Sequence, residues 1–458
     1  MKTSTIVDTD YLEHIVAETQ NPHPETIIKI IEKAMAKKGL SLLEVGYLVN
    51  LKDLEFTGLL FKTASAIKQQ IYGERLVFFA PFYVSDYCVN DCEYCNFHMR
   101  NKELVRHRQT LGEVEEQTRF LIDQGHKRIL LESGEDSIHN TIDYVVQVIE
   151  KIYSVSTSKG NIRRINVNIA ATTREDYRKL KQAGIGTYQL FQETYHKPTY
   201  ERLHCGPKAD YLRQMTAHGR AFEAGIDDVG LGVLFGLYDW RFEVLGLVAH
   251  AQYLDKTYGV GPHTISVPRF QPAPSVYYKP EHVVSDQDFL RLIAIVRLAV
   301  PYTGMIISTR ERPEIRRTAF KIGISQTSAG SVTTTGGYGK EGGQPQFILH
   351  DHRPLSEVIV DAVEDKLLPS FCTACYRRRR TGKRFMELAK HGEIHNLCRP
   401  NAILTFAEYL FDYTTDGLMD KGKKLIREYL EQIEDEALKR ETKKRLEQIA
   451  EGKRDIYF

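Results

Sequence analysis

Six of the seven cysteines in this chain fall into two spaced groups. The first is a C-x3-C-x2-C run and the second is a C-x2-C-x22-C run; their members are Cys88, Cys92, Cys95, Cys372, Cys375 and Cys398. Closed structural zinc or iron–sulfur sites normally use four protein ligands, so three thiolates leave one coordination position free. A free position can bind a molecule that reacts. The spacing therefore predicts an enzyme that handles two iron–sulfur clusters, each with one iron open to a ligand.

Each group also admits a zinc interpretation in which a histidine supplies the missing ligand. The candidate fourth ligands are His98 or His107 for the first group and His391 or His395 for the second. The first group directly follows a predicted strand, which favours a cluster, because parallel barrels place their chemistry at the carboxyl ends of the strands. The seventh cysteine, Cys205, fits neither spacing and is predicted to be a packed or idle thiol.

Basic side chains follow the first two cysteines of the second group. The tract Arg377–Arg380, extended by Lys383 and Arg384, would suit an anionic ligand or an anionic cluster. A solvated helix face is the alternative interpretation.

Composition and charge exclude several classes of protein. The formal charge of +2 implies no strongly basic face, so we expect no nucleic-acid partner. No apolar run approaches about 20 residues, so we expect no membrane span. The first residues are polar and acidic, unlike an export signal or a transit peptide. Together with the metal-type cysteine spacings, this predicts a reducing, cytoplasmic compartment and metal ligands rather than disulfides.

The elements that must position these cysteines change in character along the chain. Residues 1–74 are predicted to form a helical N-terminal extension. Residues 75–340 alternate short β-rich runs with helical runs, which predicts an α/β fold, a (β/α)8 TIM-like barrel, with an open doubly wound sheet as the alternative. Residues 341–458 are predicted to be a helical C-terminal domain that binds the auxiliary cluster and ends in one long helix over 425–452.

The first cysteine group resembles the signature of the radical S-adenosylmethionine (SAM) enzymes. Tyr94 matches the aromatic residue that is usual between the second and third cysteines. The resemblance implies a 4Fe–4S cluster whose open iron binds SAM and cleaves it reductively. The resulting 5′-deoxyadenosyl radical abstracts hydrogen from a substrate.

Further residues match the SAM-binding positions of the same family. Ser133, Gly134 and Glu135 resemble the turn that receives the methionyl amino group, where a glycine allows close backbone approach. Glu193 and Arg213 resemble the acid and base that hold the polar ends of SAM, and an arginine suits its carboxylate. An ordinary strand-end acid and a helix-surface arginine are the alternative.

The pairing of both cysteine groups resembles the tyrosine lyases that mature FeFe-hydrogenase. The segments GPHTISVPRFQPAPS, SAGSVTTTGGY and FCTACYR carry this resemblance, which covers nearly the whole chain. It implies a complete eight-unit radical SAM barrel with a second 4Fe–4S cluster in a C-terminal helical domain. It also implies cleavage of L-tyrosine to p-cresol and dehydroglycine, followed by formation of CO and cyanide as iron ligands for the hydrogenase active-site cluster.

The same resemblance places further site residues and partners. His263, at the start of the sixth predicted strand, matches the histidine that helps to hold an additional iron on the second cluster. Ser308, Thr309 and Arg310, at the end of the seventh, are candidates to reach into the barrel, where an arginine would fix the tyrosine carboxylate. The competing arginines are Arg269 and Arg312. The implied partners are a reductant such as ferredoxin or flavodoxin and other hydrogenase maturation proteins.

Four other functions compete with this interpretation. The 2-iminoacetate synthase of thiamine biosynthesis shares tyrosine cleavage and the first motif, but Cys372, Cys375 and Cys398 argue against it. A biotin-synthase-like sulfur inserter would carry its second cluster inside the barrel. A non-catalytic cluster carrier would keep the first motif without turning over SAM. A zinc-ribbon nucleic-acid binder is disfavoured by the balanced charge.

Overall fold

The computed structural model describes residues 6–414 and 416–458, and its centre is a closed barrel of eight parallel strands. The barrel strands are β1 (Arg75–Ser85), β2 (Arg128–Ser133), β5 (Arg164–Asn168), β6 (Thr187–Gln189), β7 (Asp228–Gly232), β8 (Thr264–Ser266), β9 (Gly304–Ile307) and β10 (Gln326–Ser328). Neighbouring strands pair in that order, and the pairing of Val77 with Gln326 joins β1 to β10 and closes the ring. The predicted (β/α)8 barrel is confirmed, and the open doubly wound sheet is wrong.

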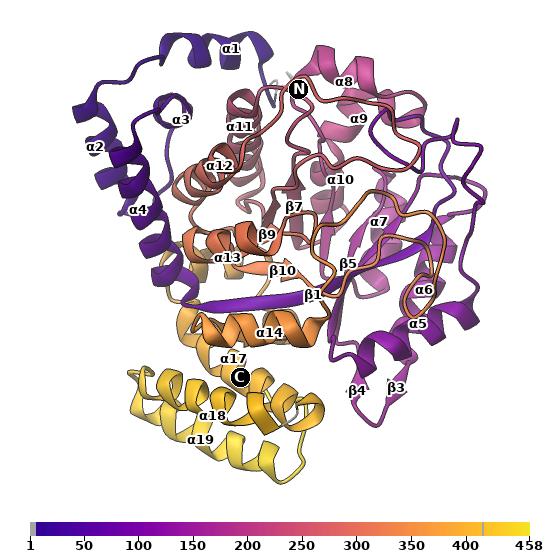
Figure 1. Cartoon of the computed structure of the whole chain (residues 1–458), viewed down its shortest axis with the longest axis vertical. Coiled ribbons are helices and arrows are strands. Elements are labelled where there is room, and N and C mark those ends of the chain that lie inside the picture. Colours follow the sequence, from indigo (N-terminus) through magenta and orange to yellow (C-terminus); the bar gives the residue numbers. More distant parts are fainter. Residues whose placement is uncertain (1–5, 415) are drawn as a thin grey trace.

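Helices cover the outside of the barrel (Figure 1). They are α5 (Leu111–Asp123), α6 (Ile142–Ser154), α7 (Arg174–Gln182), α8 (Lys197–Leu203), α9 (Tyr211–Met215), α10 (Ala217–Glu223), α11 (Trp240–Tyr258), α12 (Asp286–Ala299) and α13 (Pro313–Ile322). A short hairpin, β3 (Ser156–Thr157) and β4 (Gly160–Asn161), and the 3-10 turn η1 (Pro207–Ala209) lie between them. Every residue of β1 after Arg75 is buried, as expected for a strand with side chains packed inside the barrel and helices outside.

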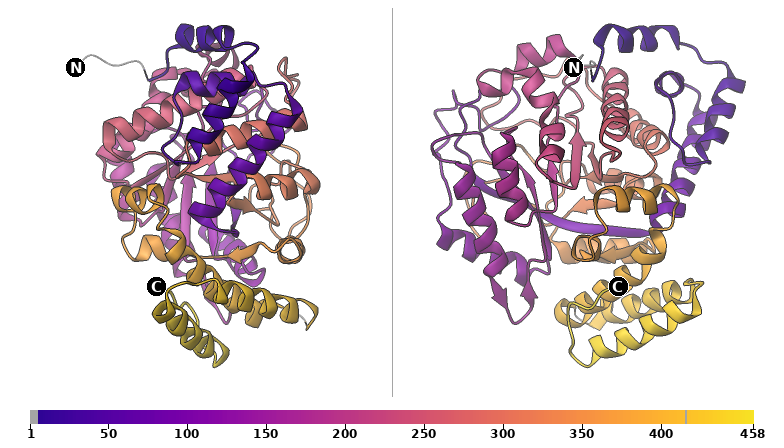
Figure 2. Two further views of the ribbon diagram at one scale, coloured as in Figure 1. Left: turned by 90° about the vertical axis from the view of Figure 1, so that its left-hand side faces the viewer. Right: turned by 180° about the vertical axis from the view of Figure 1, so that it is seen from behind.

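The predicted helical extension consists of four helices: α1 (Thr9–Glu18), α2 (Pro24–Ala34), α3 (Leu42–Val49) and α4 (Leu54–Tyr72). Local sequence sets their starts. Ser41 and Glu44 form a capping box at α3, and the Asp53 side chain accepts from two backbone N–H groups at the start of α4. The left panel of Figure 2 shows these indigo helices lying across one side of the barrel. Within the described residues, no helix is long and apolar enough to cross a membrane.

The chain after the barrel is mostly helical but departs from the prediction in two places. Its elements are α14 (Leu355–Glu364), β11 (Leu368–Ser370), α15 (Ala374–Arg377), α16 (Gly382–Lys390), α17 (His395–Tyr413), α18 (Asp416–Glu431) and α19 (Glu436–Ala450). The wholly helical prediction is wrong at β11, which pairs with the first residues of β1 and so belongs to the same sheet. The prediction of one terminal helix over 425–452 is also wrong.

The break between α18 and α19 has a local cause. The Asp435 side chain accepts hydrogen bonds from Ala437 N (2.8 Å) and Leu438 N (3.0 Å), which starts a new helix. An N-cap residue has a non-helical backbone, so the helix cannot run through it. The two helices form the yellow pair beneath the barrel in Figure 1. The predicted domain boundaries at residues 74 and 340 stay predictions.

Candidate active site

The first cysteine loop leaves the carboxyl end of β1 and is seated against the turn that follows β2. Val89 N donates to Glu135 O over 2.7 Å, and Gly134 N donates to Ser85 O over 3.1 Å. A Cβ atom on Gly134 would lie 2.4 Å from the carbonyl oxygen of Tyr87. Only glycine lets the two backbones come this close. The turn formed by Ser133, Gly134 and Glu135 therefore helps to position the cysteine loop.

The three cysteines of this loop form no disulfide with any described residue and are largely enclosed. Cys92 is buried, while Cys88 and Cys95 are half-buried. Burial raises the pKa of Cys95 to about 11 and raises that of Cys92 further above its usual range. Thiolates in such surroundings need cations beside them, so the loop fits an iron cluster by the chemistry of its donors. Gln346 adds a side-chain amide 3.6 Å from Cys95 Sγ.

The histidines near this loop have other partners. His98 Nδ1 lies 2.9 Å from Asp91 Oδ1, and His107 Nε2 lies 3.2 Å from Glu113 Oε1. Both candidates for a fourth zinc ligand are therefore engaged by carboxylates. Tyr94, which is buried against Cys92, forms a hydrogen bond of 2.7 Å to His204 Nε2.

Two ion pairs flank the cysteine loop and contain the acids and the base that were predicted to hold SAM. Glu135 pairs with Arg213 (2.6 Å), and its other oxygen accepts from the Asn90 side chain (2.6 Å). Glu193 pairs with Lys208 (2.7 Å), a residue that no sequence motif singled out. Glu193 has a φ of 69°, a left-handed backbone that is uncommon outside glycine and marks a constrained position.

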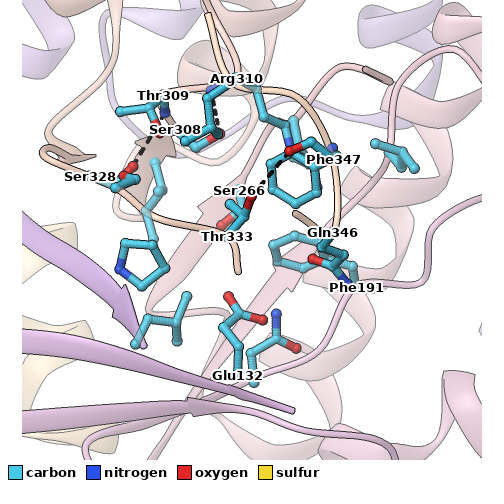
Figure 3. A pocket seen from close by; sticks show the side chains of 18 of the residues that line it. Glu132, Phe191, Ser266, Ser308, Thr309, Arg310, Ser328, Thr333, Gln346 and Phe347 are labelled. Carbon is cyan, nitrogen blue, oxygen red and sulfur yellow. Dashed lines mark hydrogen bonds between the residues drawn. The ribbon is translucent and has the colours of Figure 1, made fainter. Parts of the chain in front are cut away.

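A cavity opens inside the barrel (Figure 3). Tyr94 and Cys95 are among the residues that line it. The volume of this cavity is about 140 Å³. Its walls combine apolar side chains with a few polar groups, an ordinary composition for a small-molecule site. Among the residues that line it are Tyr83, Glu132, Asn168, Phe191, Glu193, Ser266, Ser308, Thr309, Arg310, Thr333, Gln346 and Phe347.

The three residues predicted after the seventh barrel strand all line this cavity. Ser308 Oγ accepts from Arg310 N (3.4 Å), and Thr309 N donates to Ser328 Oγ (3.3 Å). The Arg310 guanidinium lies 3.2 Å from the centre of the Phe347 ring. The competing arginines lie elsewhere: Arg269 pairs with Glu311 and Asp286, and Arg312 is half-exposed and pairs with Asp286.

Glu132 is a cavity residue that sequence reasoning missed. It lies on β2 next to Ser133, and Figure 3 shows its carboxylate pointing into the cavity. Burial raises its pKa to about 8, although Arg310 and Asn168 act in the opposite direction. The sequence does not distinguish Glu132 from an ordinary acidic residue at the end of a strand, because it is the only acid in the run RILLES.

The second cysteine group lies at the opposite end of the barrel, where the strands begin. Its three cysteines come from three elements: the loop after β11, helix α15 and helix α17. All three cysteines line one small cavity, whose volume is about 40 Å³. The other residues lining it are Tyr72, Arg75, Arg128, His263, Gly304, Gln326, Thr373, Tyr376 and Phe385.

His263 is brought to the cysteines as predicted. It immediately precedes β8 and lines the same cavity. Its Nε2 lies 3.4 Å from the Tyr376 hydroxyl, and its Nδ1 lies 3.4 Å from Asp228 Oδ1. Nδ1 makes no hydrogen bond to any residue within 6–414 or 416–458. The unsatisfied Nδ1 faces Asp228, and the buried imidazole shares a cavity with three thiols, a set of donors that suits a metal centre.

Arginines surround the second site and favour an anionic group there. Arg128 Nη1 donates to the Cys372 carbonyl (2.8 Å), and Arg75 lines the cavity. Burial raises the pKa of Cys375 to about 12, so a charged sulfur needs cationic neighbours. Sequence reasoning missed both arginines, since each stands alone at the start of a strand.

The alternative zinc ligands of the second group are engaged by backbone. His391 Nδ1 lies 2.8 Å from the Glu387 carbonyl, and His395 Nδ1 lies 2.6 Å from the Gly392 carbonyl. Neither lines the cysteine cavity. Cys205 is exposed and lines neither cavity. The prediction of a packed thiol is therefore wrong, and a thiol without a role in either site is the alternative that is left.

Two protein-family models match successive segments of the chain. Residues 82–245 match the Radical SAM superfamily, and residues 266–365 match the Biotin and Thiamin Synthesis associated domain. The barrel, with a C-x3-C-x2-C loop at the carboxyl end of its first strand, defines the class: an enzyme of the radical SAM superfamily. That class implies a 4Fe–4S cluster and SAM as cofactors.

Solved structures narrow the class to a family. The fold matches a crystal structure of HydG, a maturase of the FeFe-hydrogenase, with a TM-score of 0.96 and 49% identity over 99% of this chain and 100% of that one. HydG from Carboxydothermus hydrogenoformans matches with a TM-score of 0.86 and 40% identity over 97% and 99% of the two chains. The chain belongs to the HydG family of radical SAM maturases.

A second group of relatives is more distant. The 2-iminoacetate synthase of Salmonella typhimurium is 30% identical over 328 residues, 70% of this chain and 84% of the relative. The HydE maturase subunit of Thermotoga maritima is 25% identical over 57% of this chain and 71% of the relative.

Proposed function

We propose that this protein cleaves L-tyrosine by radical SAM chemistry to p-cresol and dehydroglycine. It then converts the dehydroglycine to CO and cyanide, which leave as ligands of an iron destined for the active-site cluster of FeFe-hydrogenase. The observation that carries the proposal is the presence of two three-cysteine sites at opposite ends of one barrel, with His263 beside the second. The membership of the chain in the HydG family supports it.

At the first site, Cys88, Cys92 and Cys95 would hold three irons of a 4Fe–4S cluster. When bound, that cluster supplies the electron that cleaves SAM to the 5′-deoxyadenosyl radical. Tyr94 lies against the loop and lines the barrel cavity, where it shields the site from solvent. A protected cavity matters because water or stray hydrogen donors would quench a radical before it met its substrate.

The polar groups that would hold SAM are the two ion pairs beside the loop. Glu135, on the turn after β2, would accept hydrogen bonds from the methionyl ammonium group, as its present partner Asn90 donates to it now. Arg213 would bind the methionyl carboxylate, for which a planar guanidinium is suited. Glu193 would accept a hydrogen bond from a donor group at the other end of the cofactor, and the positive charge of Lys208 would balance its negative charge.

The tyrosine substrate would occupy the barrel cavity. Arg310 would bind its carboxylate, with Ser308 and Thr309 supporting that arginine and offering hydroxyl groups. Phe191 and Phe347 provide apolar wall for the phenol ring. This arrangement orients the substrate toward the cysteine loop at one side of the cavity.

At the second site, Cys372, Cys375 and Cys398 would hold a second 4Fe–4S cluster. His263 would contribute a neutral nitrogen to the additional iron, which travels with the product. Residues 341–458 are accordingly proposed as the unit that binds this cluster, and residues 75–340 as the barrel that holds the first. The partners of this chemistry would be a reductant such as ferredoxin or flavodoxin and the other hydrogenase maturation proteins.

An anaerobic assay tests the proposal. Reconstituted protein is given reductant, SAM and L-tyrosine, with deoxyhaemoglobin to trap CO and chromatography to detect p-cresol and 5′-deoxyadenosine. We expect both p-cresol and CO. Deoxyadenosine with neither product would keep the radical chemistry and discard tyrosine as the substrate.

The second candidate function is that of a 2-iminoacetate synthase. It is favoured by the similarity to the Salmonella typhimurium enzyme over 328 residues and by the match to the Biotin and Thiamin Synthesis associated domain. It leaves the second cysteine cavity and its histidine without a role. In the assay above, p-cresol without CO would support this function instead.

A further inference from the structure

The arginine tract that follows Cys375 makes contacts that neither proposed cluster explains. Arg379 has a φ of 54°, a left-handed backbone that is unfavourable for a non-glycine residue. Arg380 is only 8% exposed, and its N–H donates to the Cys375 carbonyl over 2.7 Å. A buried arginine and a strained turn directly after a cluster ligand need some other part of the chain to hold them in place.

Residues 455–458 supply that support. Asp455 Oδ2 lies 2.6 Å from Arg377 Nη1, and the Tyr457 ring centre lies 3.9 Å from the same guanidinium. Arg380 Nη2 donates to the Phe458 carbonyl over 2.7 Å. These residues therefore hold the tract at both of its ends.

Two of these residues, Asp455 and Phe458, also bind α17, which carries Cys398. Asp455 N donates to Glu408 Oε2 (3.1 Å), and Phe458 N donates to Asn401 Oδ1 (2.9 Å). Cys398, Asn401 and Glu408 are spaced by three and seven residues, so they lie along one face of the helix. Asp455 and Phe458 thus each make one bond to α17 and one to the arginine tract.

Charges and packing behind residues 455–458 keep them in place. Arg163, whose side chain is 4% exposed, lies 3.1 Å from Asp455 and also pairs with Glu408. On the other side, the Arg445 guanidinium of α19 lies 3.7 Å from the centre of the Phe458 ring. Figure 1 shows this end of the chain folded back beside α17.

We propose that residues 455–458 are a brace that fixes the arginine tract against α17 and so sets the spacing of the three cysteines of the second site. The inference rests on the proposed role of those cysteines as cluster ligands. Asp455 and Tyr457 are positioning residues, since they touch neither cavity. A cluster tolerates only a narrow range of ligand positions, so a looser brace should cost cluster occupancy at the second site and leave the first unchanged.

The test compares the double variant Asp455→Ala/Tyr457→Ala with the conservative double variant Asp455→Glu/Tyr457→Phe. Lys453→Ala, at an exposed neighbouring side chain, is the matched control. After reconstitution, we expect the alanine variant to lose about four of the roughly eight irons per chain. Its 5′-deoxyadenosine formation should stay within about two-fold of wild type, because the first site is untouched. The conservative variant and the control should load both clusters.

A second readout needs no cluster. In the apo-protein, the rate at which a thiol reagent alkylates Cys372 and Cys375, followed by mass spectrometry, should rise about tenfold in the alanine variant as the loop opens locally. Alkylation of Cys92 should be unchanged.

Three results would overturn the brace: full second-site iron in the alanine variant, equal loss of iron from both sites, or failure of the conservative variant to restore loading. Wild-type protein that takes up only the first cluster would instead contradict the proposed function. The alkylation rates would still decide whether the brace exists.

Discussion

The two cysteine sites of this barrel are built in different ways. The first takes its three thiols from one loop of eight residues, seated on the glycine turn after β2. The second takes them from three elements and adds a histidine from the start of β8. A local site can be read from a motif, whereas an assembled site depends on every element that carries a ligand. The two sites should therefore fail separately, and for different reasons.

The largest expected effect is at the first site. Replacing Cys92 by Ser removes a buried ligand of the only cluster proposed to bind SAM, so 5′-deoxyadenosine, p-cresol and CO should all fall to background. Product analysis by liquid chromatography measures this. Iron bound at the second site should remain, since its ligands lie at the other end of the barrel. If 5′-deoxyadenosine still forms, the proposal that this cluster cleaves SAM is wrong.

The next largest effect separates the activity of the second site from that of the first. The double variant Cys372→Ser/Cys375→Ser should abolish CO formation and leave p-cresol formation largely intact, because tyrosine cleavage is placed in the other cavity. The ratio of CO to p-cresol, measured in one reaction, is the readout. If both products disappear together, the second site is needed for folding or for chemistry at the first, and the separation fails.

A smaller effect probes how the first loop is seated. Gly134→Ala would place a Cβ atom 2.4 Å from the Tyr87 carbonyl, which should displace the loop and destabilise the fold by about 1–3 kcal/mol. First-site iron should drop in the reconstituted variant while second-site iron stays. Gly58→Ala is the matched control, because its Cβ meets no neighbour within 4 Å and a helical glycine gains stability from the change. Equal iron content in both variants would show that the turn does not support the loop.

The last expected effect is a pH dependence of stability. Burial raises the pKa of Glu132 from its usual 4.5 to about 8 in the folded chain. Its contribution is present in full below about pH 4.5 and is lost as the pH rises through about 8, at no more than about 1.4 kcal/mol per pH unit. The Glu132→Gln variant should therefore show a flatter decline of stability over this window. Urea unfolding of apo-protein across that range measures it, and parallel curves for variant and wild type would contradict the raised pKa.

What the sequence predicts well is local. The cysteine spacings, the Gly134 turn and the strand–helix alternation each leave a signal within a few residues, so the barrel was predicted correctly and the proposed SAM residues lie beside the loop. Glu132, Arg75, Arg128 and Lys208 leave no such signal. Each becomes a site residue because strands far apart in the sequence meet around a cavity.

The errors follow the same rule. β11 is short and contains a proline, so its sequence resembles a loop, and it is a strand because β1 offers it a free edge. The break at Asp435 was hidden among charges that suit a continuous helix. The ion pair of Arg213 with Glu135 was not predicted, because it depends on where α9 lies against the β2 turn, which spacing alone does not specify.

The central claim is that one barrel carries two separate iron clusters, one at each end. Anomalous diffraction at the iron edge from crystals of the reconstituted protein tests it directly. We predict two strong iron peaks, one beside Cys88, Cys92 and Cys95 and the other beside Cys372, Cys375 and Cys398 near His263. A single peak at the first site, with the second cysteines free or bound to zinc, would contradict the account.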